Sequence, residues 1–174
     1  MYGRQRGGHM KGREDITDKS DIIKGVFVKK LKVIPDDRGF LMEMIRNDDP
    51  FWKNKFGQVY MTVCKPGYVK GWHYHNLQDD HFVVIKGTGR VLLYDNRKDS
   101  PTKGNYLEFI MGENNPLCVV IPKGVLHGIE CNEDEECYLV NTVTEAYNYS
   151  NPDEFRVDPF DNDIPIKWNS TKGG

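Results

Sequence analysis

The sequence predicts an all-β fold arranged as a sandwich or jelly roll. From Ile22 onward, short runs rich in Val, Ile, Tyr and Phe are separated by Gly, Pro, Asn and Asp, as strands are separated by turns. Helical periodicity is almost absent over the same residues. About ten strands follow from this pattern, and such a number is typical of a sandwich or jelly roll.

The expected elements can be placed in order because turn residues bound each apolar run. One short helical turn is expected at 49–53, since Asp49 can cap it and Pro50 suits its first position. The stretch 147–168 is rich in Asn, Asp and Pro, which predicts a short irregular C-terminal tail packed by its aromatic residues. The expected strands are 25–33, 40–46, 58–64, 71–75, 82–86, 90–94, 106–111, 118–121, 128–131 and 136–142.

The composition describes a globular chain with a nearly neutral surface. Of its 174 residues, 24 are basic and 26 acidic, which gives a formal net charge of −2. This balance does not favour a nucleic-acid or membrane partner recruited by bulk charge. No stretch approaches the roughly 18 apolar residues that a membrane span needs, and the length is typical of one domain.

The N-terminus and the cysteines indicate the organisation and the compartment of the chain. Residues 1–9 end in Gly7-Gly8-His9 before Met10 and resemble an expression-tag remnant, so 10–174 is expected to form the single domain. The four cysteines lack Cys-x-x-Cys spacing, and three lie among alternating apolar residues, as buried free thiols do. We therefore expect a cytoplasmic protein, since free thiols suit a reducing compartment.

The four histidines after Met10 lie within two short windows. Side chains on a strand alternate between faces, so His73 and His75 point the same way with Cα atoms about 7 Å apart, which suits two ligands of one ion. After a turn at 76–79, Asp80 begins the returning strand and can supply an oxygen. A Pro-x-Gly turn at 122–124 would deliver His127 from a third strand. His81 alternates to the face opposite Asp80 and is expected at solvent or at a subunit contact.

The donor set decides which metals would fit these residues. His73, His75, Asp80 and His127 together offer three imidazoles and one carboxylate, a set of intermediate hardness. Such a set suits Fe, Mn, Ni, Co or Zn better than Ca or Mg. A divalent transition-metal site is therefore one use that the sequence predicts for them.

The order of these residues resembles the paired motifs of the cupin superfamily. Gly67 is followed by His73-Tyr74-His75, then by Asp80 and Gly87, and the second motif runs from Pro122 to His127. The resemblance implies a cupin-type double-stranded β-helix, a small jelly roll whose barrel interior holds the site.

A narrower resemblance, over about 23–168, is to the dTDP-4-dehydrorhamnose 3,5-epimerase family within the cupins. The segment 36–43 resembles that family's Arg-Gly-x-x-x-Glu segment, and 56–58 resembles its Phe-x-Gln. Residues 70–74 resemble Arg-Gly-Leu-His-Tyr, and 95–104 resemble Asp-x-Arg-x-x-Ser-Pro-Thr-x-Gly. Residues 122–128 and 164–168 complete the series.

The resemblance implies a metal-free reaction and a role for each matching residue. In that family a His removes protons from C3 and C5 beside a 4-keto group, a Lys holds the enolate, and a Tyr returns a proton from the opposite face. His73 falls on the base and Tyr147 on the acid, with Tyr149 as the alternative. A nucleotide-sugar partner and a homodimer are also implied. The residues expected to hold the nucleotide diphosphate or line the sugar pocket are Arg38, Glu43, Gln58, Lys70, Trp72, Arg97 and Tyr149.

Three positions differ from the family pattern. The family's Lys falls on Asp80, and its Gln two places after the base is His75. The family's orienting Asp, which follows the terminal Trp in a Ser-x-Lys-Asp segment, has no match because this chain ends in Asn169-Ser170-Thr171-Lys172 and two glycines. Each change removes part of the metal-free site, and the first two add a ligand for a metal.

Three functions therefore remain open. The first is a sugar-nucleotide epimerase or isomerase that removes a proton alpha to the ketone of a 4-keto-6-deoxy sugar nucleotide. The second is a metal-dependent cupin isomerase, lyase or oxygenase, and the third is a non-catalytic sugar-binding cupin. For Arg38 and Arg97 the alternative is a turn-stabilising ion pair with Asp36 and Asp95. The edge segment 22–33 is expected to add to a neighbour's sheet in a homodimer.

Overall fold

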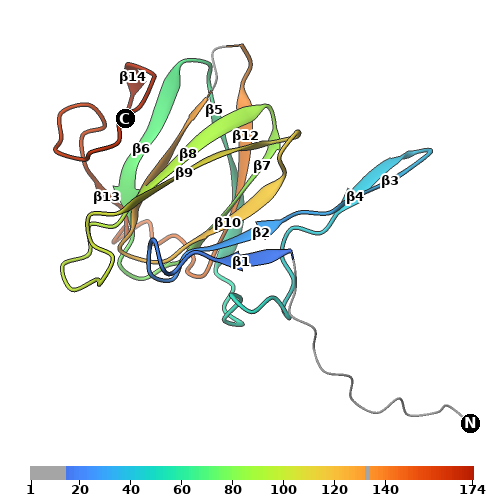
Figure 1. Cartoon of the computed structure of the whole chain (residues 1–174), viewed down its shortest axis with the longest axis horizontal. Coiled ribbons are helices and arrows are strands. Elements are labelled where there is room, and N and C mark those ends of the chain that lie inside the picture. Colours follow the sequence, from blue (N-terminus) through green and yellow to red (C-terminus); the bar gives the residue numbers. More distant parts are fainter. Residues whose placement is uncertain (1–14, 132–133) are drawn as a thin grey trace, which may run out of the picture.

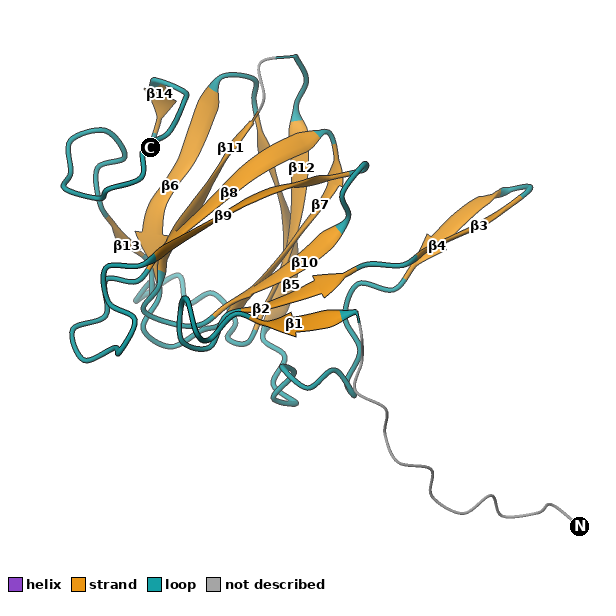
Figure 2. Ribbon diagram, in the orientation of Figure 1, coloured by secondary structure: helices purple, strands orange, loops and turns teal. Residues whose placement is uncertain are grey.

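The computed structural model describes residues 15–131 and 134–174, so the expected boundary at residue 10 lies outside the described residues. Within these ranges it contains strands and turns but no helix (Figure 2), which confirms the all-β prediction. No helix there could cross a membrane. The strands are β1 Ile16–Asp18, β2 Phe27–Lys30, β3 Val33–Asp36, β4 Gly39–Met42, β5 Gln58–Cys64, β6 Tyr68–Tyr74, β7 Asp80–Lys86, β8 Thr88–Tyr94, β9 Tyr106–Gly112, β10 Leu117–Ile121, β11 Leu126–Cys131, β12 Cys137–Val143, β13 Phe155–Arg156 and β14 Lys172–Gly173.

Two antiparallel sheets face each other and form the jelly roll (Figure 1). The first sheet has the order β1-β2-β10-β7-β12-β5, so β5 forms one of its edges. The second has the order β13-β6-β11-β8-β9, and β14 joins β6 by parallel pairing. Consecutive strands such as β5 and β6 lie in different sheets, which brings residues close in sequence to facing walls of the barrel.

The main core fills the space between the sheets. Along β12 buried and half-buried residues alternate, because every second side chain of a strand points inward. Leu139 and Val143 are on the buried side, and so is the polar residue Asn141, which is 0% exposed. The apolar partners of Leu139 from the other strands include Val84, Val91, Met111 and Ile129. Asn141 is a buried polar residue on the same inward face of β12.

The C-terminal tail covers the outer face of the second sheet, as the sequence predicted for an irregular segment packed by aromatic residues. Ile164, Ile166 and Trp168 pack on Val69, Trp72, Leu92 and Leu126 from three strands of that sheet. The backbones of β6 and β11 lie unusually close under Trp168, because a Cβ added at Gly128 would lie 2.8 Å from the Cα of Gly71. The tail thereby fixes the strand that carries His73.

The N-terminal third differs from the expected strands. The expected strand 25–33 is divided, since β2 ends at Lys30 and Val33 begins a separate hairpin, β3–β4, that projects from the barrel (Figure 1). The expected strand 40–46 ends at Met42, where the pairing of β4 with β3 in this hairpin ends. β1 was not expected. The expected helical turn at 49–53 is a single turn closed by Trp52 N–H donating to the Asp49 carbonyl at 2.9 Å, with no helix following.

Candidate functional site

Two neighbouring hollows open at one end of the barrel. The first, called here the inner hollow, measures about 460 Å³ and lies between the two sheets. The second, called the outer hollow, measures about 630 Å³ and is bounded by the loop after β12. Tyr60 and Glu154 line both. The inner hollow is also lined by Thr62, Lys70, His73, Phe82, Ile129, Leu139, Arg156 and Asp158, and the outer by Gln58, His75, Gln78, Tyr147, Tyr149 and Asp153.

Three of the predicted histidines meet at the boundary of these hollows. His73 and His127 are register partners in the pairing of β6 with β11, and their ring centroids are 4.3 Å apart. His75 lies 5.6 Å from His73 and 5.7 Å from His127 by the same measure. One ring nitrogen from each lies within 4.8 Å of the others. The strand parity argued from the sequence therefore places the three side chains together.

Backbone carbonyls fix which nitrogen of two rings carries the proton. His127 Nδ1 lies 2.9 Å from the Val125 carbonyl oxygen, and His75 Nδ1 contacts the carbonyl oxygen of Asp153. A carbonyl can only accept, so each Nδ1 carries the hydrogen and each Nε2 presents a lone pair. Both Nε2 atoms are buried and have no hydrogen-bond partner among the described residues.

Asp80 lies beside these lone pairs. It is 1% exposed, and its Oδ2 is 3.8 Å from Nε2 of both His75 and His127. Its Oδ1 accepts hydrogen bonds from Asn141 at 2.6 Å and Gln78 at 3.1 Å. Asp80 thus lies beside the group that His73, His75 and His127 form, and hydrogen bonds orient His75, His127 and Asp80.

The environment favours the neutral form of His73 and His127. Burial lowers the pKa of His73 well below its usual value, and the neighbouring imidazoles His127 and His75 and the cations Arg156 and Lys70 lower it further. Burial also lowers the pKa of His127, against the opposing effect of Asp80. A neutral imidazole can take up a proton or bind a metal, whereas an imidazolium can do neither.

Two cations accompany His73 in the inner hollow. Lys70 lies on the same strand, and Arg156 is the register partner of His73 in the pairing of β13 with β6. Arg156 is held by an ion pair of 2.6 Å to Glu154. Sequence reasoning found Lys70 but missed Arg156, because a two-residue strand in the irregular tail gives no periodic signal. It also missed Tyr60, although the parity of β5 places Tyr60 on the same face as the predicted Gln58.

The predicted residues of the loop after β12 line the outer hollow. Tyr147 is 42% exposed and Tyr149 90%, and their rings meet edge to face at 4.9 Å. Gln58 Oε1 accepts a hydrogen bond of 3.2 Å from the backbone N–H of Tyr147. Gln58 therefore positions this loop from β5.

Three other predicted residues lie away from the open space of the hollows. Arg38 is on the projecting hairpin, where its side chain is 84% exposed and pairs with Asp36 at 2.7 Å. Glu43 follows that hairpin and pairs with Arg46 at 3.0 Å. Trp72 is 1% exposed and packs at 4.6 Å on Trp168, so it contributes only to the wall of the inner hollow.

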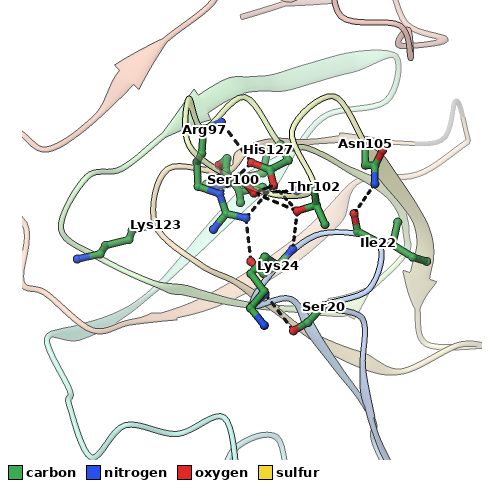
Figure 3. A network of polar contacts seen from close by, with 12 residues as sticks. Ser20, Ile22, Lys24, Arg97, Ser100, Thr102, Asn105, Lys123 and His127 are labelled. Atoms are coloured by element: carbon green, nitrogen blue, oxygen red, sulfur yellow. Dashed lines mark hydrogen bonds and ion pairs between the residues drawn. The ribbon is translucent and has the colours of Figure 1, made fainter.

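Arg97 belongs to a loop network rather than to either hollow (Figure 3). Its guanidinium donates two hydrogen bonds of 2.8 Å to Asp95, which is 0% exposed, and one to the Lys24 carbonyl. The hydroxyls of Ser100 and Thr102 each donate to Asp95 at 2.6 Å. The ion-pair alternative thus describes Arg97 here, and the Asp-x-Arg-x-x-Ser-Pro-Thr motif closes this loop.

His81 lies on the face opposite Asp80, as expected, but the expectation that it reaches solvent or a subunit contact is wrong. Its side chain is 2% exposed because Phe51 and Trp52 cover it, with ring centroids at 5.8 and 5.3 Å. Its Nδ1 lies 2.7 Å from the Thr142 carbonyl oxygen. The segment after β4 returns over this face, which the sequence pattern did not indicate.

Comparison with known proteins identifies the relatives of the chain. Residues 20–173 match the family model described as dTDP-4-dehydrorhamnose 3,5-epimerase. A spore coat polysaccharide biosynthesis protein of Bacillus subtilis is 41% identical over 149 residues, covering 86% of this chain and 98% of the relative. A probable low-salt glycan biosynthesis epimerase of Haloferax volcanii is 41% identical, covering 80% of this chain and 89% of that one.

A solved structure extends the comparison to the fold. The crystal structure of a dTDP sugar isomerase from Desulfovibrio desulfuricans superposes with a TM-score of 0.77 at 29% identity, covering 83% of this chain and 91% of that one. The family match spans both sheets and the C-terminal tail that packs on them. The chain therefore belongs to the dTDP-4-dehydrorhamnose 3,5-epimerase family and has its cupin-type jelly roll.

Proposed function

We propose that the protein is an isomerase that inverts a carbon next to the ketone of a 4-keto-6-deoxy sugar nucleotide. The observation that carries this proposal is a half-buried, neutral imidazole, His73, that lines the inner hollow together with two cations. Family membership and the sugar-nucleotide enzymes among the relatives support the substrate class. A cytoplasmic location is part of the proposal, supported by four cysteines that are all buried as free thiols.

The chemistry follows from the charges around His73. Its neutral ring accepts the proton alpha to the C4 ketone, and the electron pair of the broken C–H bond moves into the enolate. Lys70 and Arg156 stabilise the negative oxygen, in place of the Lys whose position Asp80 occupies. The reaction on these residues needs no cofactor. Tyr147 is the phenol that the family motif assigns to return of the proton, and it lies on the rim of the outer hollow.

The two hollows divide the proposed substrate. Their volumes fall within the roughly 300–1,000 Å³ of small-molecule sites. The sugar binds in the inner hollow against His73. The nucleotide binds in the outer hollow, beside Gln58 and Tyr149. Lys70, which lines the inner hollow, is the third residue proposed to bind the substrate.

We also propose that the protein is a homodimer. The β3–β4 hairpin exposes Phe40 at 69% and Leu41 at 58%, and the edge strand β5 exposes Met61 at 54%. Unpaired edges and apolar side chains of this kind favour association with a second copy. Arg38 and Glu43 line neither hollow of their own chain, and we propose that they contact the substrate of a partner in the dimer.

Proton exchange tests the isomerase proposal. The protein is incubated with dTDP-4-keto-6-deoxyglucose in D₂O, and incorporation of deuterium at C3 or C5 is followed by mass and proton spectra. We expect incorporation by the wild type and its loss in His73→Ala, with His81→Gln as a control because His81 is buried outside the site. Absence of enzyme-dependent exchange would overturn the proposal, and binding of the nucleotide without exchange would support a sugar-binding cupin.

The second candidate is a metal-dependent enzyme, which one observation favours. The Nε2 atoms of His75 and His127 are buried without partners, and each ring is oriented by a carbonyl on its other nitrogen, as metal-binding imidazoles are. Fe, Mn, Ni, Co or Zn would fit the set His73, His75, Asp80 and His127. Such an ion would supply a Lewis acid for a substrate oxygen.

Metal analysis separates the two candidates. The protein is expressed with supplementation by each metal in turn and analysed for metal content before and after chelation. If the protein is a metal enzyme, the wild type should contain about one metal ion per chain. The ion should be lost in His75→Ala and retained in His81→Ala. Asp80→Asn should weaken binding less than loss of a His, since the amide oxygen can still coordinate. Metal content indifferent to all of these variants would exclude the second candidate.

A further inference from the structure

Tyr60 and His73 line the inner hollow from different sheets. On β5, Tyr60 and Thr62 line the inner hollow, while Val59 and Met61 point away and are more than half exposed. β5 belongs to the first sheet, whereas His73 is on β6 of the second sheet. A sugar ring held between the sheets would therefore have His73 on one face and Tyr60 on the other.

The amide of Asn141 fixes the hydrogen bonding of Tyr60. Asn141 is the register partner of Tyr60 in the pairing of β12 with β5. Its Oδ1 accepts the backbone N–H of His81 at 3.0 Å, and a backbone N–H can only donate, so the orientation of the amide is determined. The two hydrogens of Nδ2 therefore point to Tyr60 Oη at 2.9 Å and to Asp80 Oδ1 at 2.6 Å.

This arrangement leaves the phenolic hydrogen of Tyr60 available. The phenol oxygen accepts from Asn141, and its own hydrogen has no acceptor among the residues that the structure describes. Burial, with the negative charge of Asp80, raises the pKa of Tyr60 to about 12, so the hydrogen stays on the oxygen at neutral pH. A protonated phenol that opens onto both hollows is a proton donor.

An inversion at carbon needs a base and an acid on opposite faces of the ring. If His73 both removed and returned the proton, the carbon would keep its configuration. Tyr147, the acid that the family motif assigns, lines the outer hollow only, whereas Tyr60 lines both hollows. The two phenols are similarly exposed, Tyr60 at 39% and Tyr147 at 42%, so their position and not their exposure distinguishes them. Tyr60 is on the facing wall of the hollow that holds His73.

We propose that Tyr60 is the catalytic acid that delivers the proton to the enolate from the face opposite His73. The inference rests on the proposed isomerase function. His73 takes the alpha proton and becomes imidazolium, and the electron pair enters the enolate. The Tyr60 O–H bond then breaks, its proton forms the new C–H bond, and the ketone is restored. The resulting phenolate is held by the Asn141 N–H and is reprotonated from solvent, to which the imidazolium gives its proton.

The test measures exchange and inversion separately in Tyr60→Phe. With dTDP-4-keto-6-deoxyglucose in D₂O, we expect inversion to fall about 100-fold or more, which is the usual contribution of a general acid. Deuterium exchange with retained configuration should continue, because His73 can still remove and return the proton. Tyr138→Phe on β12 is the matched control, since the Tyr138 hydroxyl meets only Glu136 among the described residues. Binding of dTDP confirms that each variant is folded.

Each outcome has one meaning. Inversion at the wild-type rate in Tyr60→Phe overturns the inference, and so does loss of exchange together with inversion in a variant that still binds dTDP. Retention of configuration in Tyr147→Phe instead of Tyr60→Phe also overturns it, in favour of Tyr147. Absence of exchange in the wild type is a failure of the proposed function, not of the assignment of Tyr60.

Discussion

Arg156 lies directly opposite His73 in the antiparallel pairing of β13 with β6. Register partners point to the same face of a sheet, so the guanidinium shares the inner hollow with the imidazole. The stacked rings of Tyr74 and Phe155, with centroids 5.2 Å apart, hold the adjacent pair of this short ladder. The irregular tail thereby supplies a cation where the family's Lys is absent.

Removal of this cation should slow the chemical step. We expect Arg156→Gln to lower kcat about 100-fold, the usual effect of losing one donor to a developing oxyanion, with a smaller change in KM. Arg156→Lys should recover part of the rate because it restores the charge. Arg46→Gln serves as the control, since Arg46 pairs with Glu43 and Asp48 on the surface. Equal rates for Arg156→Gln and the wild type would show that Lys70 alone stabilises the enolate.

The contact between Trp72 and Trp168 should be a main support of the tail. Trp168 is 8% exposed, and replacement of a buried Trp by Ala costs about 3–5 kcal/mol. We expect Trp168→Ala to lower the free energy of unfolding by this amount in urea titrations. Phe160→Ala, at a 42% exposed position of the same tail, should change it by less than about 0.5 kcal/mol. Similar values for the two variants would contradict the role of Trp168.

The sequence predicted the barrel better than the segments attached to it. Strands such as β9 and β12 are apolar runs bounded by turn residues, and the alternation along each run gives its inward face directly. The β3–β4 hairpin has the same composition, and nothing in its pattern shows that its faces lack a partner within the chain. The burial of His81 was also not visible in its own strand, because the residues that cover it, Phe51 and Trp52, belong to a segment that precedes β5 in the sequence.

The candidate site was predictable where it depends on local geometry. His73 and His75 follow from strand parity, and the turn before His127 is visible in the sequence. Asn141 and Arg156 could not be found in this way, because each joins the site through pairing between strands distant in sequence. Strand parity does place Tyr60 on the face of Gln58, but its hydrogen bond from Asn141 depends on the same distant pairing. Arg97 shows the converse. It belongs to a motif typical of the family, but its guanidinium donates two hydrogen bonds to Asp95 of the same loop and does not line either hollow.

Asp95 should make stability depend on acid pH. Burial alone would raise its pKa, but hydrogen bonds from Arg97, Ser100 and Thr102 outweigh this effect and hold the pKa well below its usual value. The unfolded chain therefore binds the proton first, so the stabilisation is complete above about pH 4 and is lost as pH falls.

Substitution of Asp95 measures that contribution. Asp95→Asn should lower the free energy of unfolding by about 3 kcal/mol at pH 7, as loss of one partner of a buried pair does. The difference in the free energy of unfolding between Asp95→Asn and the wild type should be smaller at pH 3, where the wild-type carboxylate no longer contributes its full stabilisation. Asp99→Asn, an exposed position in the same loop, is the control. A gap of constant size from pH 7 to pH 3 would contradict the assignment to the carboxylate.

The apolar hairpin should hold two copies of the chain together. Val33, Ile34, Phe40 and Leu41 are each at least 40% exposed, and a group of this size on one projecting element is unfavourable in water unless a partner covers it. We expect light scattering to give a dimer mass at micromolar concentration. Phe40→Ser combined with Leu41→Ser should shift the mass toward the monomer, because the contact loses its two most exposed side chains.

A matched substitution and an activity measurement complete this prediction. Ile110→Ser removes a 48% exposed apolar side chain from β9, the edge strand of the other sheet, and should leave the dimer intact. If the hairpin also carries Arg38 to the substrate of a partner, the monomeric variant should have a higher KM for the nucleotide sugar. Arg38→Ala should then raise KM without changing the dimer mass. A monomer mass for the wild type would remove the basis for both effects, and Arg38 would remain a surface residue paired with Asp36.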